Sequence, residues 1–298
     1  MRGWIAGLLG AAAWALAACS PAAPTAAPAG EPALWRIADS DSEIWIFGSV
    51  HMLPAGVEWR NDRLNAAFAS ADEFITETAT GPEALEAFQQ ASTQHGAMPA
   101  GERLSDRLSR QDQVRLRRAI NANGLDSAAV EGTRPWLVAL QLSLMAAMRE
   151  GQSPDNGVEN ILFAEAARDG KRMSYFETPD EQVRILADLP PDAEAHFLAV
   201  TLREIEGDSA AAMAAMDEAW AEGDTVTLDR MLAEQWREAG PVVHEAMILR
   251  RNRAWADEIA ERLDSSGTIF IAVGAAHLLG DGSVIDLLRD RGVTVEGP

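Results

Sequence analysis

The sequence predicts an α/β fold of the α+β kind, in which both ends of the chain contribute to one central mixed β-sheet and a large helical lobe is inserted between them. Two observations lead to this fold class. Short apolar runs with strand character occur near both ends of the chain. Between them, long stretches show apolar residues at helical spacing.

The first strands are expected at Leu34–Ile37 and Glu43–Phe47. Residues 39–42 between them read Asp-Ser-Asp-Ser, which is typical of a turn, so the two runs predict a β-hairpin. A helix is expected over Asn61–Ala69. The short apolar run Glu73–Thr76 then predicts a third strand.

The middle of the chain is predicted to be mainly helical, in the insertions 81–170 and 190–240. Gly and Pro separate the helical runs. The expected helices are Glu83–Ser92, Arg110–Ala122, Trp136–Arg149, Val158–Asp169, Asp180–Ala187 and Asp192–Trp236, the last broken near Gly207 and Gly223. A strand is expected at Met173–Phe176, between the two insertions.

The last part of the predicted domain, which extends over 34–298, returns to the sheet. One long helix is expected over Pro241–Leu263, followed by a strongly apolar strand at Thr268–Val273. A helix over Ser283–Arg289 and a final strand over Val293–Val295 are expected to complete the domain.

Residues 1–18 have the pattern of a signal peptide. Arg2 is followed by the apolar run Trp4–Leu16, which is too short to cross a bilayer as a helix, and Leu-Ala-Ala then precedes Cys19. Small residues before a cysteine are what a lipoprotein signal peptidase requires. We therefore expect Cys19 to be lipidated, the alternative being an ordinary secretory signal beside a bystander thiol.

Residues 19–33 are rich in Ala, Pro and Thr and predict a flexible tether. Ser20, rather than Asp, follows the cysteine, which favours anchoring at the periplasmic face of the outer membrane. Stable anchoring of this kind needs several acyl chains. The formal net charge of −21 argues against a nucleic-acid partner.

Two predicted strands end in the same motif. Residues 44–53 align with residues 270–279, and in each segment an apolar strand is followed by Gly-x-x-His and two apolar residues. Glycine permits a sharp turn or a close backbone approach. His51 and His277 are therefore expected at the sheet edge where α/β folds bind ligands. The alternative is that both imidazoles are structural groups bonded to loop backbone.

Acidic residues end two further predicted strands, at Glu77 and Glu177. With the two histidines they predict a site for a divalent transition metal such as Mn, Co or Zn. Arg251, on the long helix before the second motif, is a candidate for binding a carboxylate or an oxyanion. Its neighbours Arg250 and Arg253 leave that assignment open by one position.

These residues make the chain resemble the TraB/PrgY/GumN family, in its GumN-like bacterial branch. The matching segments are Ile46–His51, Glu77, Gly157–Glu159, Phe176–Thr178 with Glu181–Gln182, Arg251–Arg253 with Trp255, Val273–Gly280 with Gly282, and the closing Leu287–Leu288 and Gly292–Val293. The two histidine motifs, the glutamate pair and the arginine of the family fall on His51, His277, Glu77, Glu177 and Arg251. Glu159 stands where this branch often has Asp.

The resemblance implies a fold similar to the erythromycin-esterase and ChaN proteins, and an activity similar to that of Tiki, a membrane-tethered metal-dependent protease. It thus implies a metal-dependent hydrolase with peptide substrates. His51, His277 and Glu77 would hold the metal, with the roles of Glu77 and Glu177 as ligand or general base left open, and Arg251 would orient the substrate. The alternatives are a non-catalytic module that binds a peptide, haem or a metal, and a structural envelope protein.

Overall fold

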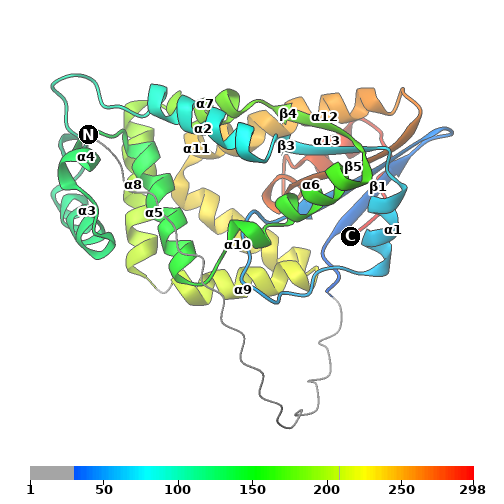
Figure 1. Ribbon diagram of the computed structural model, residues 1–298, viewed down its shortest axis with the longest axis horizontal. Coiled ribbons are helices and arrows are strands. Elements are labelled where there is room, and N and C mark those ends of the chain that lie inside the picture. The colour runs from blue at the N-terminus through cyan, green and yellow to red at the C-terminus, as the bar shows by residue number, and fades with distance from the viewer. Residues whose placement is uncertain (1–29, 208) are drawn as a thin grey trace, which may run out of the picture.

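The computed structural model of the chain describes residues 30–207 and 209–298 (Figure 1). The predicted signal peptide, Cys19 and residues 19–29 of the predicted tether lie outside the described residues. Within the described ranges, no helix combines the length and the apolar character that crossing a membrane requires.

A five-stranded sheet forms the centre of the fold, in the spatial order β1-β2-β5-β3-β4. Its strands are β1 (Leu34–Ala38), β2 (Ser42–Ser49), β3 (Glu73–Thr78), β4 (Arg172–Glu177) and β5 (Gly267–Gly274). β1 and β2 form the predicted antiparallel hairpin, and all other neighbours are parallel. The mixed sheet built from both ends of the chain is therefore confirmed.

Apolar residues occupy successive positions along the inner strands of the sheet. Because successive side chains point to opposite faces, both faces of the sheet are apolar. In β5, Ile269 and Ile271 point to one hydrophobic cluster and Phe270 to the other. Helices α12 (Arg250–Arg262) and α13 (Val284–Asp290) cover the first face through residues such as Trp255 and Ile285. The second face is covered by α1 (Asp62–Ser70), α6 (Val158–Asp169), α9 (Ser209–Ala221) and α10 (Thr225–Ala239).

The remaining helices form the lobe inserted between the strands, and Figure 1 shows α3, α4, α5 and α8 at the end of the molecule away from the sheet. They are α2 (Pro82–His95), α3 (Arg110–Asn123), α4 (Ser127–Glu131), α5 (Pro135–Arg149), α7 (Pro179–Ala187), α8 (Pro191–Glu206) and α11 (Pro241–His244). Two clusters hold the lobe together, one joining α3, α4, α5 and α8 and the other joining α2, α5, α7 and α11. The helical region therefore divides, because α6 and α9 pack on the sheet, while α10 packs on the sheet through Leu228 and Leu232 and on the lobe through Ala239.

Two local predictions need correction. The strand predicted at Val293–Val295 does not form, and only Glu296 bridges to Arg36 of β1. Gly292 and Gly297 on either side have positive φ angles of 80° and 116°, so the segment between them is too short for a ladder. The long helix predicted over Pro241–Leu263 contains a π-helical turn at Glu245–Leu249, between α11 and α12.

Candidate functional site

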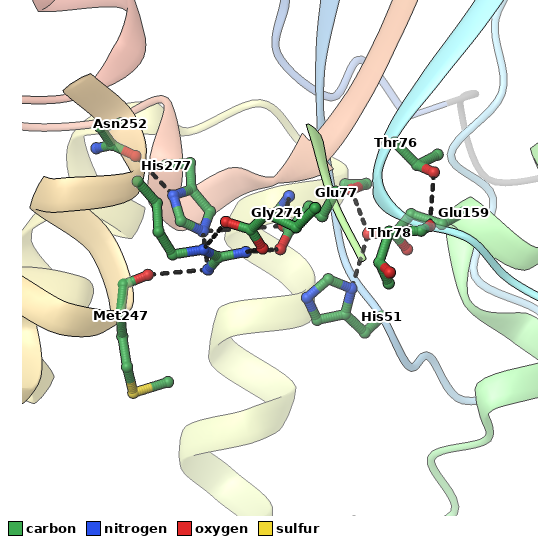
Figure 2. A network of polar contacts seen from close by, with 12 residues as sticks. His51, Thr76, Glu77, Thr78, Glu159, Met247, Asn252, Gly274 and His277 are labelled. Atoms are coloured by element: carbon green, nitrogen blue, oxygen red, sulfur yellow. Dashed lines mark hydrogen bonds and ion pairs between the residues drawn. The ribbon is translucent and has the colours of Figure 1, made fainter. Parts of the chain in front are cut away.

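The sheet topology brings the predicted polar residues to one edge. Strands β2, β5, β3 and β4 are parallel neighbours, so their carboxyl ends lie side by side. His51 follows β2, His277 follows β5, and Glu77 and Glu177 lie at the ends of β3 and β4. Figure 2 shows the resulting network, with His277 and Asn252 at one end and His51 and Glu159 at the other.

Arg251 is the centre of this network and uses all of its donors within the protein. Its Nε and Nη2 atoms donate to the two oxygens of Glu177 at 2.7 and 2.9 Å, and Nη2 also donates to Glu77 Oε2 at 2.6 Å. Its Nη1 atom contacts the Met247 carbonyl at 2.9 Å and His277 Nε2 at 3.0 Å. A guanidinium has five N–H groups. All five are therefore occupied, and in this arrangement Arg251 holds the site together and has no donor left for a substrate.

Glu77 is buried between positive and polar groups. Its Oε1 accepts a hydrogen bond from the Gly274 backbone N–H at 2.8 Å, while Oε2 is bound by Arg251. Burial opposes ionisation, but His277, Arg251 and His51 outweigh it and lower the pKa of Glu77 to about 2. His277 contributes only when protonated, so Arg251 and protonated His51 are the cations that keep Glu77 ionised at neutral pH.

His277 is a buried imidazole whose two ring nitrogens both have partners within the protein. Its Nε2 lies against Arg251, which can only donate, so we assign the ring proton to Nδ1, where it is donated to Asn252 Oδ1 at 2.6 Å. Burial lowers the pKa of His277 to about 3, although Glu77 opposes this shift. The ring is 3% exposed and lies 4.4 Å from the Trp255 ring, centroid to centroid.

His51 has the opposite surroundings. Its side chain is 67% exposed, and its Nδ1 lies 2.7 Å from Oε1 of the buried Glu159, which also accepts a hydrogen bond from Ser49 Oγ at 2.5 Å. The Glu159 carboxylate raises the pKa of His51 to about 10, against the effect of burial of the ring nitrogens. The second ring nitrogen, Nε2, is directed towards Gly274 and Glu77.

The contact between His51 and Glu159 depends on a close approach of α6 to the first Gly-x-x-His turn. A Cβ atom on Gly157 would lie 2.2 Å from the His51 carbonyl oxygen, so only glycine fits there. Val158 N–H donates to the Val50 carbonyl at 3.1 Å and fixes the start of α6 at this turn. Both motif glycines act through close approach too, since neither Gly48 nor Gly274 has a positive φ.

The side chains as arranged do not fit a divalent metal. Within residues 30–207 and 209–298, no group of three or more His, Cys, Asp and Glu side chains is placed to hold a metal ion. The reason is visible in the network, because the guanidinium of Arg251 lies between Glu77 and Glu177 and also occupies Nε2 of His277. Metal binding by these residues stays a prediction that requires Arg251 to be displaced.

Comparison with known proteins identifies the family of the chain. The model of the TraB/PrgY/gumN family matches residues 33–297. The chain belongs to that family. It is 25% identical to "Uncharacterized protein YbaP" of Escherichia coli (strain K12) over 245 residues, which cover 82% of this chain and 87% of that protein. A protein of the same name from Shigella flexneri matches to the same extent. No solved structure shows a significant match.

Three partners of the network in this TraB-family chain were not predicted from the sequence as site residues. Asn252 is fully buried and forms a hydrogen bond with His277. Glu159 forms an ion pair with His51, and the Met247 carbonyl accepts a hydrogen bond from Arg251. A signal for Asn252 was present. It lies three, four and seven residues before the buried Trp255, Ala256 and Ile259, so helical spacing alone places it on the buried face of α12.

The structure also assigns the three neighbouring arginines. Arg251, on which the arginine of the family falls, binds the two glutamates. Arg253 forms an ion pair with Glu245 on the surface. Arg250 is exposed and lines a separate cleft near Glu177.

Proposed function

We propose that this TraB-family protein is a hydrolase in which His51, held by Glu159, is the reactive base. The observation that supports the proposal is the exposed imidazole of His51, bonded through Nδ1 to a buried carboxylate, at the carboxyl edge of the sheet. A histidine oriented by a carboxylate is a recurrent general base in hydrolysis. Peptides are the substrates we expect, in line with the family resemblance.

The proposed reaction uses the free nitrogen of His51. With Nδ1 bonded to Glu159, the neutral ring keeps a lone pair on Nε2 that can take a proton from water. The resulting hydroxide attacks the substrate carbonyl, and the protonated ring then returns its proton to the leaving group. Since Glu159 raises the pKa of His51, the neutral base becomes more populated as the pH rises. The rate is therefore expected to increase towards alkaline pH.

Glu77, Glu177 and Arg251 act as positioning residues in this proposal. Arg251 forms an ion pair with both glutamates and so fixes the ends of β3 and β4 next to the reactive histidine. Metal-dependent hydrolysis, with His51, His277 and Glu77 as ligands and Mn, Co or Zn as the ion, remains a competing version.

Hydrolysis of a defined peptide mixture in ¹⁸O-labelled water tests the proposal. Cleavage places the label in each new carboxylate, which mass spectrometry detects. We expect labelled products from the wild type, at least a hundredfold less from His51→Ala and Glu159→Gln, and no change in His95→Ala, a histidine bound to Asp180. Activity that survives a chelator supports the histidine base. Activity that appears only with added Mn, Co or Zn supports the metal-dependent version.

A non-catalytic binding module is the second candidate. The closed bonding of Arg251, in which no donor is free, favours it because a site of this kind can hold a fold or a ligand without turnover. Retention of a peptide, haem or a metal ion by the wild type, with no labelled product under any condition, would replace the hydrolase proposal by this one.

We also propose that the protein is a lipoprotein, with cleavage before Cys19 and a lipid on its thiol, at the periplasmic face of the outer membrane. The residues around Cys19 in the sequence support this proposal. Incorporation of an alkyne-labelled palmitate tests it. The wild type should take up the label and Cys19→Ala should not, while Ser20→Asp should move the labelled protein to the inner membrane. Labelling of Cys19→Ala would contradict the proposal.

A further inference from the structure

A cleft of about 360 Å³ lies beside the network, between α7, α12 and the end of β4. We call it the α7–α12 cleft. It reaches both Glu177 and Arg251, so one wall belongs to the candidate site. The other residues that line it include Phe176, Arg184, Ile185, Arg250 and Trp255.

Most charges that line this cleft are paired, and Glu181 and Arg250 are the two exceptions among the described residues. Arg184 is paired with Asp188 at 3.0 Å, Glu258 with Arg262 at 2.7 Å, and Glu177 with Arg251. The Glu181 carboxylate accepts hydrogen bonds from the backbone N–H and the hydroxyl of Thr178. Arg250 has no hydrogen bond or ion pair to the described part of the chain, and its side chain is exposed at the cleft. Within the described residues, Arg250 is therefore the one cation of this cleft without an anionic partner.

An apolar wall lies next to this charge. The rings of Phe176 and Trp255 stack with centroids 5.0 Å apart, and Ile185 of α7 lines the same cleft. An aromatic and aliphatic wall beside a free guanidinium is complementary to a carboxylate that is attached to an apolar group. Arg251 cannot supply this function because all of its donors are used within the protein.

We propose that the α7–α12 cleft binds the C-terminal residue of a peptide. Arg250 contacts the free carboxylate of that residue, and the apolar side chain of the same peptide residue packs against Phe176 and Ile185. The inference rests on the proposed hydrolase function, since it names a substrate group for the same site. The chain has a net charge of −21, which repels anions in general. A local free arginine is therefore the feature that would let an anionic terminus bind here.

Calorimetric binding of two matched peptides tests the inference. The probes are N-acetyl-Ala-Ala-Phe with a free carboxylate and the same peptide as its C-terminal amide, titrated into the His51→Ala protein to prevent turnover. We expect the acid to bind about tenfold tighter than the amide at low salt, since one charge-assisted contact distinguishes them. Arg250→Gln should remove this difference. Arg253→Gln, on the same helix but paired with Glu245, should keep it.

Three outcomes would overturn the inference: equal binding of acid and amide, no binding of either peptide, or equal effects of the two arginine substitutions. A peptide amide with an internal Glu that binds as tightly as the free acid would also overturn it, because the cleft would then not be specific for a chain terminus. The two proposals fail separately. Binding through Arg250 without cleavage by the wild type defeats only the hydrolase, and cleavage with an unchanged KM in Arg250→Gln defeats only this inference.

Discussion

The two Gly-x-x-His turns share a motif and a place at the sheet edge, yet they give their histidines opposite properties. His51 is 67% exposed and bonded to a carboxylate. His277 is buried, bonded to Asn252 and contacted by a guanidinium. The pKa of His51 is raised by Glu159, and the pKa of His277 is lowered by burial.

The difference shows that the motif sets where a histidine lies and the partners set what it does. Both turns follow adjacent parallel strands, with Ser49 opposite Gly274 in the register. The first turn then meets the start of α6, which supplies Glu159, whereas the second meets α12, which supplies Arg251 and Asn252. One turn therefore presents an ionisable group to solvent, and the other closes a structural network.

The largest expected effect comes from breaking the network of the second turn. Arg251→Met leaves Glu77 and Glu177 as buried carboxylates without their cation, which costs about 3–5 kcal/mol of unfolding free energy. Urea denaturation measures this loss. Arg253→Met removes an exposed ion pair on the same helix and should cost less than about 1 kcal/mol. Equal stability of the two variants would contradict the account of the network.

The same substitution in the two motifs tests the comparison directly. His277→Ala leaves a cavity beside Trp255 and unpaired groups on Asn252 and Arg251, so we expect a loss of about 2–4 kcal/mol. His51→Ala removes an exposed ring but leaves the buried Glu159 carboxylate with Ser49 as its partner, so we expect a smaller loss of about 1–2 kcal/mol. Thermal or urea unfolding of both variants decides this. A larger loss in His51→Ala would reverse the roles assigned to the two turns.

A smaller effect is expected at the glycine that brings α6 to the first turn. Gly157→Ala places a Cβ atom against the His51 carbonyl, so the backbone must shift at a cost of about 1–3 kcal/mol, and the contact between His51 and Glu159 should weaken. Urea unfolding measures the loss of stability, and the pKa of His51 measures the weakening of its contact with Glu159. Gly132→Ala is the control, because its Cβ would meet nothing closer than 3.6 Å. No difference between the variants would mean that the approach of α6 is not tight.

The mildest perturbation is a change of pH. A rise in pH should weaken the first turn, and a fall in pH should weaken the second. Folding raises the pKa of His51 above its ordinary 6.5, so its contribution is present below pH 6.5 and is lost as the pH rises through about 10. Folding lowers the pKa of His277 from 6.5 to about 3 and that of Glu77 from 4.5 to about 2. Their contributions are present above those ordinary values and are lost as the pH falls.

Urea unfolding between pH 4 and 10 should therefore show greatest stability near pH 6 to 7. Glu77→Gln should be less stable than the wild type at pH 7 and should lose less on acidification. A wild type whose stability is constant from pH 7 to 4 would contradict the pKa directions assigned to the second turn.

The convergence of the site could be predicted from the sequence because it follows from topology. A strand with an apolar pattern ends at a definite residue, and parallel neighbours bring those ends together. The sequence therefore placed His51, His277, Glu77 and Glu177 at one edge. Arg251 was identified by its match to the family, and the structure places it between the glutamates.

The contact between Glu159 and the first turn could not be predicted because it joins distant parts of the chain. Glu159 lies 110 positions after Ser49, and its approach depends on how α6 returns from the helical lobe to the sheet. No local pattern encodes that return. The failed strand at Val293–Val295 has a local cause instead, since its apolar alternation lies between Gly292 and Gly297, which have positive φ angles, and only Glu296 bridges to β1.

Titration of the two histidines by NMR tests the central claim most directly. Ring signals of the wild type, assigned by comparison with His51→Ala and His277→Ala, would be followed from pH 4 to 10, together with Glu159→Gln. The account predicts that His51 titrates above 6.5 and shifts down in Glu159→Gln, while His277 keeps one signal of a neutral ring protonated on Nδ1 down to pH 4. Two histidines that both titrate near 6.5, or an exposed His277 signal, would contradict the division of roles between the two turns.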